Sequence, residues 1–425
     1  MQTKHKARAL TVSMAMVGLL ALSACGGGNN AAGGGGDGKT ITLAATTNEK
    51  PALDAVIAKF KELNPGVDVQ FTTSALDQYQ TTTRTQLSSG TAPDVVFVWP
   101  GDGNPMATRV VAKGGFIEDL SSRPWANNYP AGIKPVTQYN GKTYSAPVTF
   151  SGIGAVYNMS AMKAAGLSAP DTWSKLLEFC SAAKAKGKTA FELGGQTNWV
   201  TQLIPFALTP TLVYGPNPQF AEDMGAKKAT FADSKWSDAM NKYLEMQKAG
   251  CFQDQPLGTD YAASLTAVAK GDALSVIQVN SGAAAIAKQA PAGTELALLP
   301  VPATDNASET RMAGAAGSSY AINSKAKNKD LALKFLDFLQ SPEGMNLYAE
   351  TNKALPSVPN DKFKVDPALV TLQEYQKAGK TDAFMDQNWP NARVQQTLFQ
   401  VAQDMLSGKA DVQSALKQMD AAYQG

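Results

Sequence analysis

Two side chains that could hold a ligand follow a short apolar segment of the chain. Residues 95–98 (Val-Val-Phe-Val) lie between turn-forming residues, which predicts a strand buried on both faces, as in a helix-covered parallel sheet. Trp99 follows this strand directly, and Asp102 ends the turn after it. Ligands of open α/β sheets bind beyond the carboxyl ends of strands. The indole therefore offers a flat apolar surface there, and the carboxylate offers hydrogen-bond acceptors. A Trp packed under a loop is the alternative.

The chemistry open to this chain is limited by its histidine content. The one histidine is His5, near the amino terminus, and residues 25–425 contain none. This excludes Ser-His-Asp and Cys-His catalysis and histidine-based zinc sites, so enzymes are disfavoured, although carboxylate pairs remain possible. No Gly-x-Gly-x-x-Gly or Gly-Lys-Ser/Thr loop stands at a strand-to-helix turn, which disfavours a nucleotide site. We expect no catalytic residue, metal or cofactor.

The bulk composition is that of an ordinary globular protein of two or three domains. The chain has 425 residues, of which 44% are hydrophobic and 17% charged, with a formal net charge of +2. Three of its basic and none of its acidic side chains lie in residues 1–24, so the rest of the chain is near −1. This balance predicts no nucleic-acid partner.

The amino terminus has the pattern of an export signal. Lys4, Lys6 and Arg8 precede an apolar run over residues 9–22 that is short for a membrane span. The following Leu-Ser-Ala-Cys resembles a lipobox, in which Cys25 becomes the lipid-modified first residue; secretory cleavage after Ala24 is the alternative. The Gly-rich run that follows predicts a flexible tether over residues 25–38.

Two further cysteines, Cys180 and Cys251, remain after the signal. An even pair in an exported protein favours one disulfide, and two buried thiols are the alternative.

The elements that must position Trp99 form a β-α-β-α-β pattern. Strands are predicted over 40–45, 67–72 and 95–98, with helices over 51–63 and 77–88 between them. This order predicts a parallel sheet with right-handed crossovers.

The remaining chain predicts a second sheet. Residues 141–158 look extended and lead from the first sheet into it, and residues 314–323 return. The apolar strand 273–279 ends at Asn280 and Ser281. Helices are expected over 172–186, 199–208, 234–248, 261–270, 330–340, 342–350, 367–377, 391–406 and 411–423.

Taken together, these residues resemble the substrate-binding lipoproteins of bacterial ABC sugar importers, the maltose-binding-protein-like group. The resemblance covers nearly everything after the tether, and the order of its segments is more specific than any one of them. The segments are the lipobox at Cys25, residues 60–69, 90–96 (Gly-Thr-Ala-Pro-Asp-Val-Val), 156–158, 165–167, 170–173, 332–339 and 341–344.

The resemblance implies a two-lobed periplasmic-binding-protein-like α/β fold of class II. Each lobe would be a mainly parallel sheet flanked by helices, and crossings over 143–149 and 311–314 would form the hinge. Lobe one would comprise residues 38–148 and 313–360, and lobe two residues 149–312 and 361–425.

The resemblance also implies a sugar held between the lobes, with its apolar face on aromatic rings and its hydroxyls on polar groups. The family has a Trp two residues beyond the Asn280–Ser281 turn, where this chain has Ala, so Trp389 could supply that ring instead. Trp173 and Trp236 are expected in the core, and Trp125 could lie either in the core or at the binding site. The candidate binding residues are Trp99, Asp102, Tyr79, Tyr157, Asn198, Trp199, Asn280, Ser281 and Trp389.

The resulting hypothesis is a monomeric, non-catalytic binding protein outside the cytoplasm, lipid-anchored to the cell membrane. It would capture a mono- or oligosaccharide and deliver it to the permease of an ABC importer. The alternatives are another polar solute, such as a glycerol phosphodiester or a peptide, or a secreted carbohydrate-active enzyme that uses two carboxylates.

Overall fold

The computed structural model of the chain describes residues 38–130 and 132–424. The predicted signal, Cys25 and the tether up to residue 37 lie outside the described residues. Within the described ranges, no helix is both long enough and apolar enough to cross a bilayer.

The first sheet contains the three strands predicted around Trp99. Its strand order is β2 (Asp68–Ser74), β1 (Thr40–Thr46), β3 (Val95–Val98), β12 (Ser319–Ile322) and β6 (Ala146–Pro147). β1 is parallel to both β2 and β3, so that Leu43 pairs with Phe71 on one side and Val95 on the other. This confirms the predicted parallel β-α-β-α-β unit. β12 is antiparallel to β3 because it returns from the second sheet.

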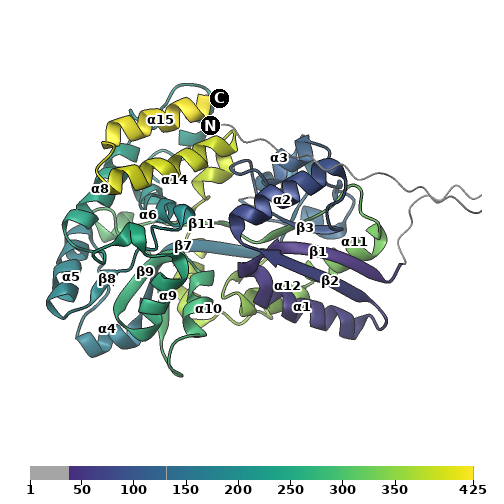
Figure 1. Ribbon diagram of the computed structural model, residues 1–425, viewed down its shortest axis with the longest axis horizontal. Coiled ribbons are helices and arrows are strands. Elements are labelled where there is room, and N and C mark those ends of the chain that lie inside the picture. Colours follow the sequence, from purple (N-terminus) through teal and green to yellow (C-terminus); the bar gives the residue numbers. More distant parts are fainter. Residues whose placement is uncertain (1–37, 131, 425) are drawn as a thin grey trace, which may run out of the picture. The chain divides into compact units, whose positions relative to one another are not determined.

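Helices cover both faces of this sheet (Figure 1). α1 (Lys50–Leu63) and α12 (Pro342–Thr351) lie on one side of it and α2 (Leu76–Ser89) on the other. α1 has Pro51 in its first turn, where no backbone N–H is needed. Its Phe60 packs edge-on against Phe335 of α11 (Lys329–Leu339), with ring centroids 5.1 Å apart. α3 (Thr108–Lys113) follows the turn after β3, and a hairpin of β4 (Gln138–Tyr139) and β5 (Lys142–Thr143) comes next.

The second sheet is built on one long strand, β7 (Thr149–Asn158), which is buried along its whole length. β7 pairs antiparallel with β9 (Ala273–Val279), β10 (Leu296–Leu299), β11 (Met312–Ala316) and β13 (Leu355–Pro356). Among the described residues of this sheet, only β8 (Thr189–Phe191) with β9 and β14 (Thr381–Asp382) with β11 are parallel pairs. The second sheet is therefore mixed, which corrects the expectation of a mainly parallel sheet in both lobes. The reason is connectivity, since β7 brings the chain from the first sheet and β11 must run the opposite way to return it.

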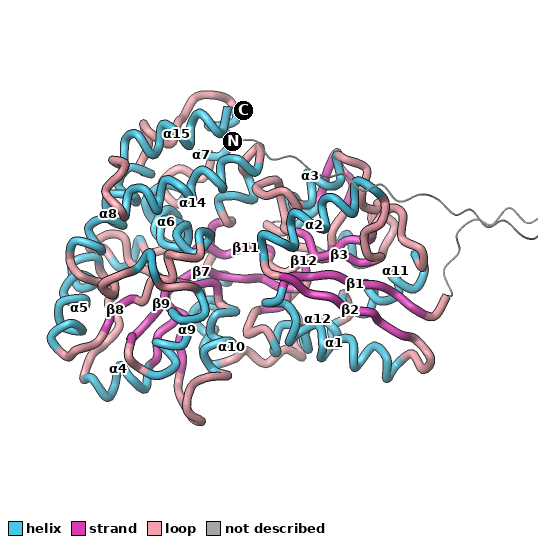
Figure 2. The backbone as a smooth tube through the Cα atoms, in the orientation of Figure 1, coloured by secondary structure: helices cyan, strands magenta, loops and turns pink. Residues whose placement is uncertain are grey.

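Most helices of the second sheet lie close to predicted ranges, whereas the short helices over residues 159–165, 220–225 and 281–287 were not predicted. Figure 2 shows how the helices surround the strands. They are α4 (Met159–Ala165), α5 (Trp173–Ala185), α6 (Leu203–Thr209), α7 (Phe220–Gly225), α8 (Trp236–Lys248), α9 (Tyr261–Lys270), α10 (Ser281–Ala287), α13 (Val370–Lys377), α14 (Ala392–Leu406) and α15 (Val412–Gln424). Cys180 of α5 is bonded to Cys251, which confirms the predicted disulfide. Trp173 and Trp236 are buried in this core, as expected.

The chain passes between the sheets at three places. Val148 lies between β6 and β7, and Gly317 and Ser318 lie between β11 and β12. The second crossing is thus three residues beyond the predicted segment 311–314, because residues 313–316 still pair with β7. The third passage, over residues 352–354, connects α12 to β13. We call the first sheet with its helices the first body, and the second sheet with its helices the second body.

Candidate functional site

Trp99 lies half-buried at the carboxyl end of β3, where the sequence predicts it. Its ring stands edge-on to Phe97, with centroids 4.5 Å apart. Its backbone N–H donates to Met106 O, and Thr108 donates back to Trp99 O. The indole is therefore held by both its ring and its backbone while part of it stays accessible, which is what a stacking surface requires.

Asp102 is held in an ion pair three residues further on. Arg109 donates to Asp102 Oδ2 at 2.9 Å and also to the carbonyl oxygens of Gln138 and Pro135. The Asp102 side chain remains about one quarter exposed, at 26%. A carboxylate so oriented can accept further hydrogen bonds but is not free to rotate.

Glu49, a residue absent from the predicted set, lies at the carboxyl end of β1 beside this edge. It ends the short helix η1 (Thr47–Glu49) and is buried, and its Oε2 accepts hydrogen bonds from Tyr348 and from Ser318 Oγ at 2.9 Å. Burial raises the pKa of the Glu49 carboxyl, and these hydrogen bonds oppose that shift. Trp99 was predicted at the site because ligands bind beyond the carboxyl ends of parallel strands. The same reasoning points to Glu49, which follows β1.

The second body contributes an aromatic pair. Trp199 lies on the short helix η4 (Asn198–Gln202), and its ring centroid is 5.0 Å from that of Tyr261, the first residue of α9. Burial, and after it the charge of Glu49, raises the pKa of Tyr261 to about 12. Tyr261 therefore lies within the electrostatic reach of Glu49. Tyr261 was also absent from the predicted set, because nothing local distinguishes it from a helix-surface tyrosine.

Asn198 and Ser281 lie half-buried on the same body. Asn198 Oδ1 accepts a hydrogen bond from the backbone N–H of Trp199 at 2.7 Å, which leaves its amide nitrogen for other partners. Ser281 is the first residue of α10.

Asn280 has a structural role in this conformation. It is fully buried; its Oδ1 accepts from Gly152 N at 2.8 Å, and its Nδ2 donates to Lys353 O at 2.5 Å. The side chain connects β7 to the third passage of the chain, and both ends of the amide are used.

Three aromatic residues of the predicted set lie in cores rather than at a binding surface. Tyr79 is 1% exposed and donates its hydroxyl to Phe97 O at 2.7 Å. Tyr157 is also 1% exposed and packs against Phe179 and Phe191. Trp389 is 3% exposed and packs against Phe206, Phe231 and Trp236. Each ring faces its own body's core, so we correct the expectation that these rings face a ligand. Trp125 is half-buried, and its indole donates to Asp337 at 2.8 Å.

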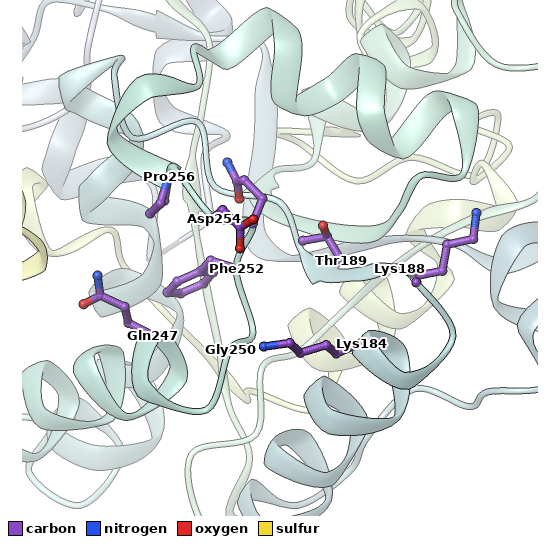
Figure 3. Close-up of a pocket in the computed structure, with 10 residues that line it drawn as sticks. Lys184, Lys188, Thr189, Gln247, Gly250, Phe252, Asp254 and Pro256 are labelled. Carbon is purple, nitrogen blue, oxygen red and sulfur yellow. The ribbon is translucent and has the colours of Figure 1, made fainter.

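The described surface also has a pocket of about 430 Å³ between the end of α5 and the loop after α8 (Figure 3). It is lined by Lys184, Lys188, Phe252 and Asp254 among others, and by none of the predicted binding residues. Within the described ranges, no cluster of His, Cys, Asp and Glu could hold a metal ion.

Two α/β sheets joined by three passages of the described chain form a two-lobed fold. The sequence model of the family described as bacterial extracellular solute-binding protein matches residues 44–346. The chain belongs to this family.

Individual relatives agree with this assignment. The chain is 24% identical to the multiple sugar-binding protein of Streptococcus mutans over 351 residues, covering 80% of this chain and 81% of the relative. It is 27% identical over 201 residues to a probable sugar-binding periplasmic protein of Mesorhizobium japonicum, covering 45% of this chain and 46% of that one.

Solved structures share the fold. A structure of RafE in complex with raffinose superposes with a TM-score of 0.75 at 21% identity, covering 90% of this chain and 98% of that one. A chitin oligosaccharide binding protein superposes with a TM-score of 0.76 at 18% identity, with the same coverage of each chain.

Proposed function

We propose that this protein captures an oligosaccharide outside the cytoplasm and delivers it to the permease subunits of an ABC importer, without chemical conversion. Membership of the solute-binding family supports the binding role. The choice of a sugar is supported by the names of the relatives, which are sugar-binding proteins.

The observation that carries this proposal is the Trp199–Tyr261 ring pair, of which Tyr261 lies within the electrostatic reach of Glu49. A sugar ring has an apolar C–H face, which stacks on an aromatic ring, and a rim of hydroxyls, which need acceptors. An aromatic pair from the second body beside a carboxylate from the first meets both needs at once.

The roles of the residues follow from their exposure and partners. Trp99 and Trp199 would stack on sugar rings, and Tyr261 would support Trp199. Hydroxyl contacts would come from Asp102, Glu49, Asn198 and Ser281. Because these residues belong to different bodies, a sugar that contacts both favours closure about the three passages.

The predicted export signal, with lipid attachment at Cys25, would place the protein on the outer side of the cell membrane as a monomer. The tether would let it reach the permease. Asp102 is paired with Arg109, and Glu49 Oε2 already accepts hydrogen bonds from Ser318 and Tyr348, which favours hydrogen bonding over a pair of glycosidase carboxylates.

The test is a thermal-shift screen of residues 39–425, the chain without its predicted signal and tether. The panel contains raffinose, stachyose, chitin and xylan oligosaccharides, monosaccharides, glycerophosphodiesters and short peptides. A ligand at 100 times its dissociation constant stabilises the folded state by about 2.7 kcal/mol. We expect a shift with one sugar class that is lost in Trp99→Ala and in Trp199→Ala and retained in Tyr375→Ala, a half-buried aromatic of α13 outside the proposed site.

Two results would contradict the proposal. One is a shift with glycerophosphodiesters or peptides and none with sugars, which would assign a different solute. The other is the release of shorter sugars on prolonged incubation, detected by chromatography, which would make the protein an enzyme.

A further inference from the structure

A close backbone contact joins the turn after β3 to the chain just before α14. The turn over residues 100–104 packs against the short helix η9 (Met385–Asn388). A Cβ on Gly101 would collide with the carbonyl oxygen of Gln387, and one on Gly103 would collide with that of Asp386. Gly101 also has φ +81°, a conformation that favours glycine. The two segments therefore meet backbone to backbone, with no room for a side chain.

The two sides of this contact belong to different bodies. The turn extends β3 of the first sheet and carries Trp99 at its start. η9 belongs to the second body, because Met385 and Trp389 lie in its core. Gln387 Nε2 also donates to Ala316 O at 2.8 Å, at the end of β11 where the chain leaves for the first sheet. Rotation of the bodies about their passages would make or break the contact between the turn and η9.

The turn lies against the backbone and Cβ of Asp386, a buried residue. A Cβ on Gly103 would lie 2.7 Å from Asp386 Cβ, so the turn sits directly on the base of the side chain. Gln395 Nε2 donates to Asp386 Oδ2 at 3.0 Å, and the described residues form no ion pair with this carboxylate. Burial raises the pKa of Asp386 to about 7, and the hydrogen bonds oppose that shift.

The ionisable groups around Asp386 are engaged elsewhere. On the turn side, Asp102 is paired with Arg109. On the β11–β14 side, Asp382 is paired with Arg311. Tyr214 of η5 (Pro210–Tyr214) lies within the electrostatic reach of Asp386, and its own pKa is raised, first by burial, so it is uncharged. Hence no neighbouring charge replaces the water that Asp386 loses on docking.

We propose that docking of the 100–104 turn on η9 is a closure contact of solute capture and that it is coupled to uptake of a proton by Asp386. This inference rests on the proposed function, because it describes how closure around the solute is regulated. A charged Asp386 must be stripped of water for the turn to dock, whereas a protonated Asp386 docks without that cost.

The sign of the coupling follows from linkage. In the docked conformation burial raises the pKa of Asp386 to about 7, and undocking, which exposes the side chain to water, lowers it toward the ordinary value of 3.8. Docking therefore takes up a proton at pH values between these two and weakens as the pH rises through that window. Between about pH 6 and about pH 8 the docking constant should fall about tenfold.

The experiment measures closure without any solute. Small-angle X-ray scattering of the ligand-free protein at about pH 8 and about pH 6 reports the fraction of closed molecules through the radius of gyration. The variants are Asp386→Asn, which stays uncharged at both pH values, and Gly103→Ala, whose methyl group blocks docking. The matched control is Gly225→Ala, at a helical glycine whose Cβ would meet nothing within 4 Å.

We expect the wild-type protein and Gly225→Ala to be more compact at the lower pH. Asp386→Asn should be equally compact at both, and Gly103→Ala equally extended at both. The same radius of gyration for wild type at both pH values would overturn the proposal, as would a wild-type pH response in Asp386→Asn or full compaction of Gly103→Ala. Far-UV circular dichroism verifies that each variant is folded.

Because no sugar is present, these outcomes are separate from the sugar screen. A protein that binds none of the sugars but still compacts at lower pH would refute the proposed solute and keep the proton-coupled contact. A protein that binds a sugar but shows no pH response would keep the proposed solute and refute the proton-coupled contact.

Discussion

Ser318 Oγ donates a hydrogen bond to Glu49 Oε2 at 2.9 Å, which ties the second crossing of the chain to the end of β1. Tyr348 and Asn352, at the end of α12 and the start of the third passage, donate to the same oxygen. One carboxylate oxygen therefore joins the proposed binding edge to two of the three connections between the bodies.

Glu49→Ala should destabilise the fold through this network. It leaves the buried hydroxyls of Ser318 and Tyr348 without their acceptor, and each lost buried hydrogen bond costs about 1–3 kcal/mol. We expect a loss of about 2–4 kcal/mol in the free energy of unfolding, measured by urea denaturation. Glu350→Ala, at an exposed position of α12, is the control and should stay within about 0.5 kcal/mol of wild type. Equal stability of the two variants would show that Glu49 contributes nothing to these connections.

The disulfide between Cys180 and Cys251 should be a major source of stability for the second body. It closes a chain separation of 71 residues, for which the loop-entropy model gives about 4 kcal/mol. The double variant Cys180→Ala/Cys251→Ala should lose about 2–4 kcal/mol in denaturant unfolding. Wild-type protein unfolded under reducing conditions serves as the comparison and should match the variant. A midpoint that is insensitive to reduction would contradict this expectation.

The Tyr79→Phe variant tests whether Tyr79 has a structural role or binds the ligand. The change removes the hydroxyl that donates to Phe97 O at 2.7 Å and should cost about 1 kcal/mol in the free energy of unfolding. Because the ring is buried away from ligand, the affinity for any sugar found in the screen should not change. Calorimetric titration measures that affinity, and a drop of tenfold or more would place Tyr79 in the site after all.

The folded protein should be more stable at mildly acidic than at alkaline pH. Asp386 has a folded pKa of about 7 and an ordinary value of 3.8, so protons bind the folded state more tightly. Its contribution to stability is complete below the ordinary value and is lost as the pH rises through about 7. Between about pH 6 and about pH 8 this amounts to about 1 kcal/mol, measured by urea denaturation.

Asp386→Asn provides the control for this pH profile. The variant has no titrating group at this position, so the difference in stability between the two pH values should shrink by about the same 1 kcal/mol. An unchanged profile would assign the pH dependence to other groups, such as Glu49, whose pKa is also raised by burial.

The sequence by itself determined the local elements. The apolar run 95–98 and strands such as Ala273–Val279 are found where predicted, and α9 spans Tyr261–Lys270 as expected. These elements are determined by the spacing of hydrophobic residues, by turn residues and by helix-capping residues, all of which act within a few residues of the chain. The Cys180–Cys251 pairing also followed, because only two cysteines remained beyond the signal.

The tertiary structure decided which side of each element faces the core and which elements meet. Tyr79 and Trp389 have the side chains of a sugar site, but their rings fill the interior. Glu49 and Tyr261 are separated by more than 200 residues and interact only because the fold brings the residues after β1 near the start of α9. Burial and long-range proximity depend on how sheets pack, and no local pattern records that packing.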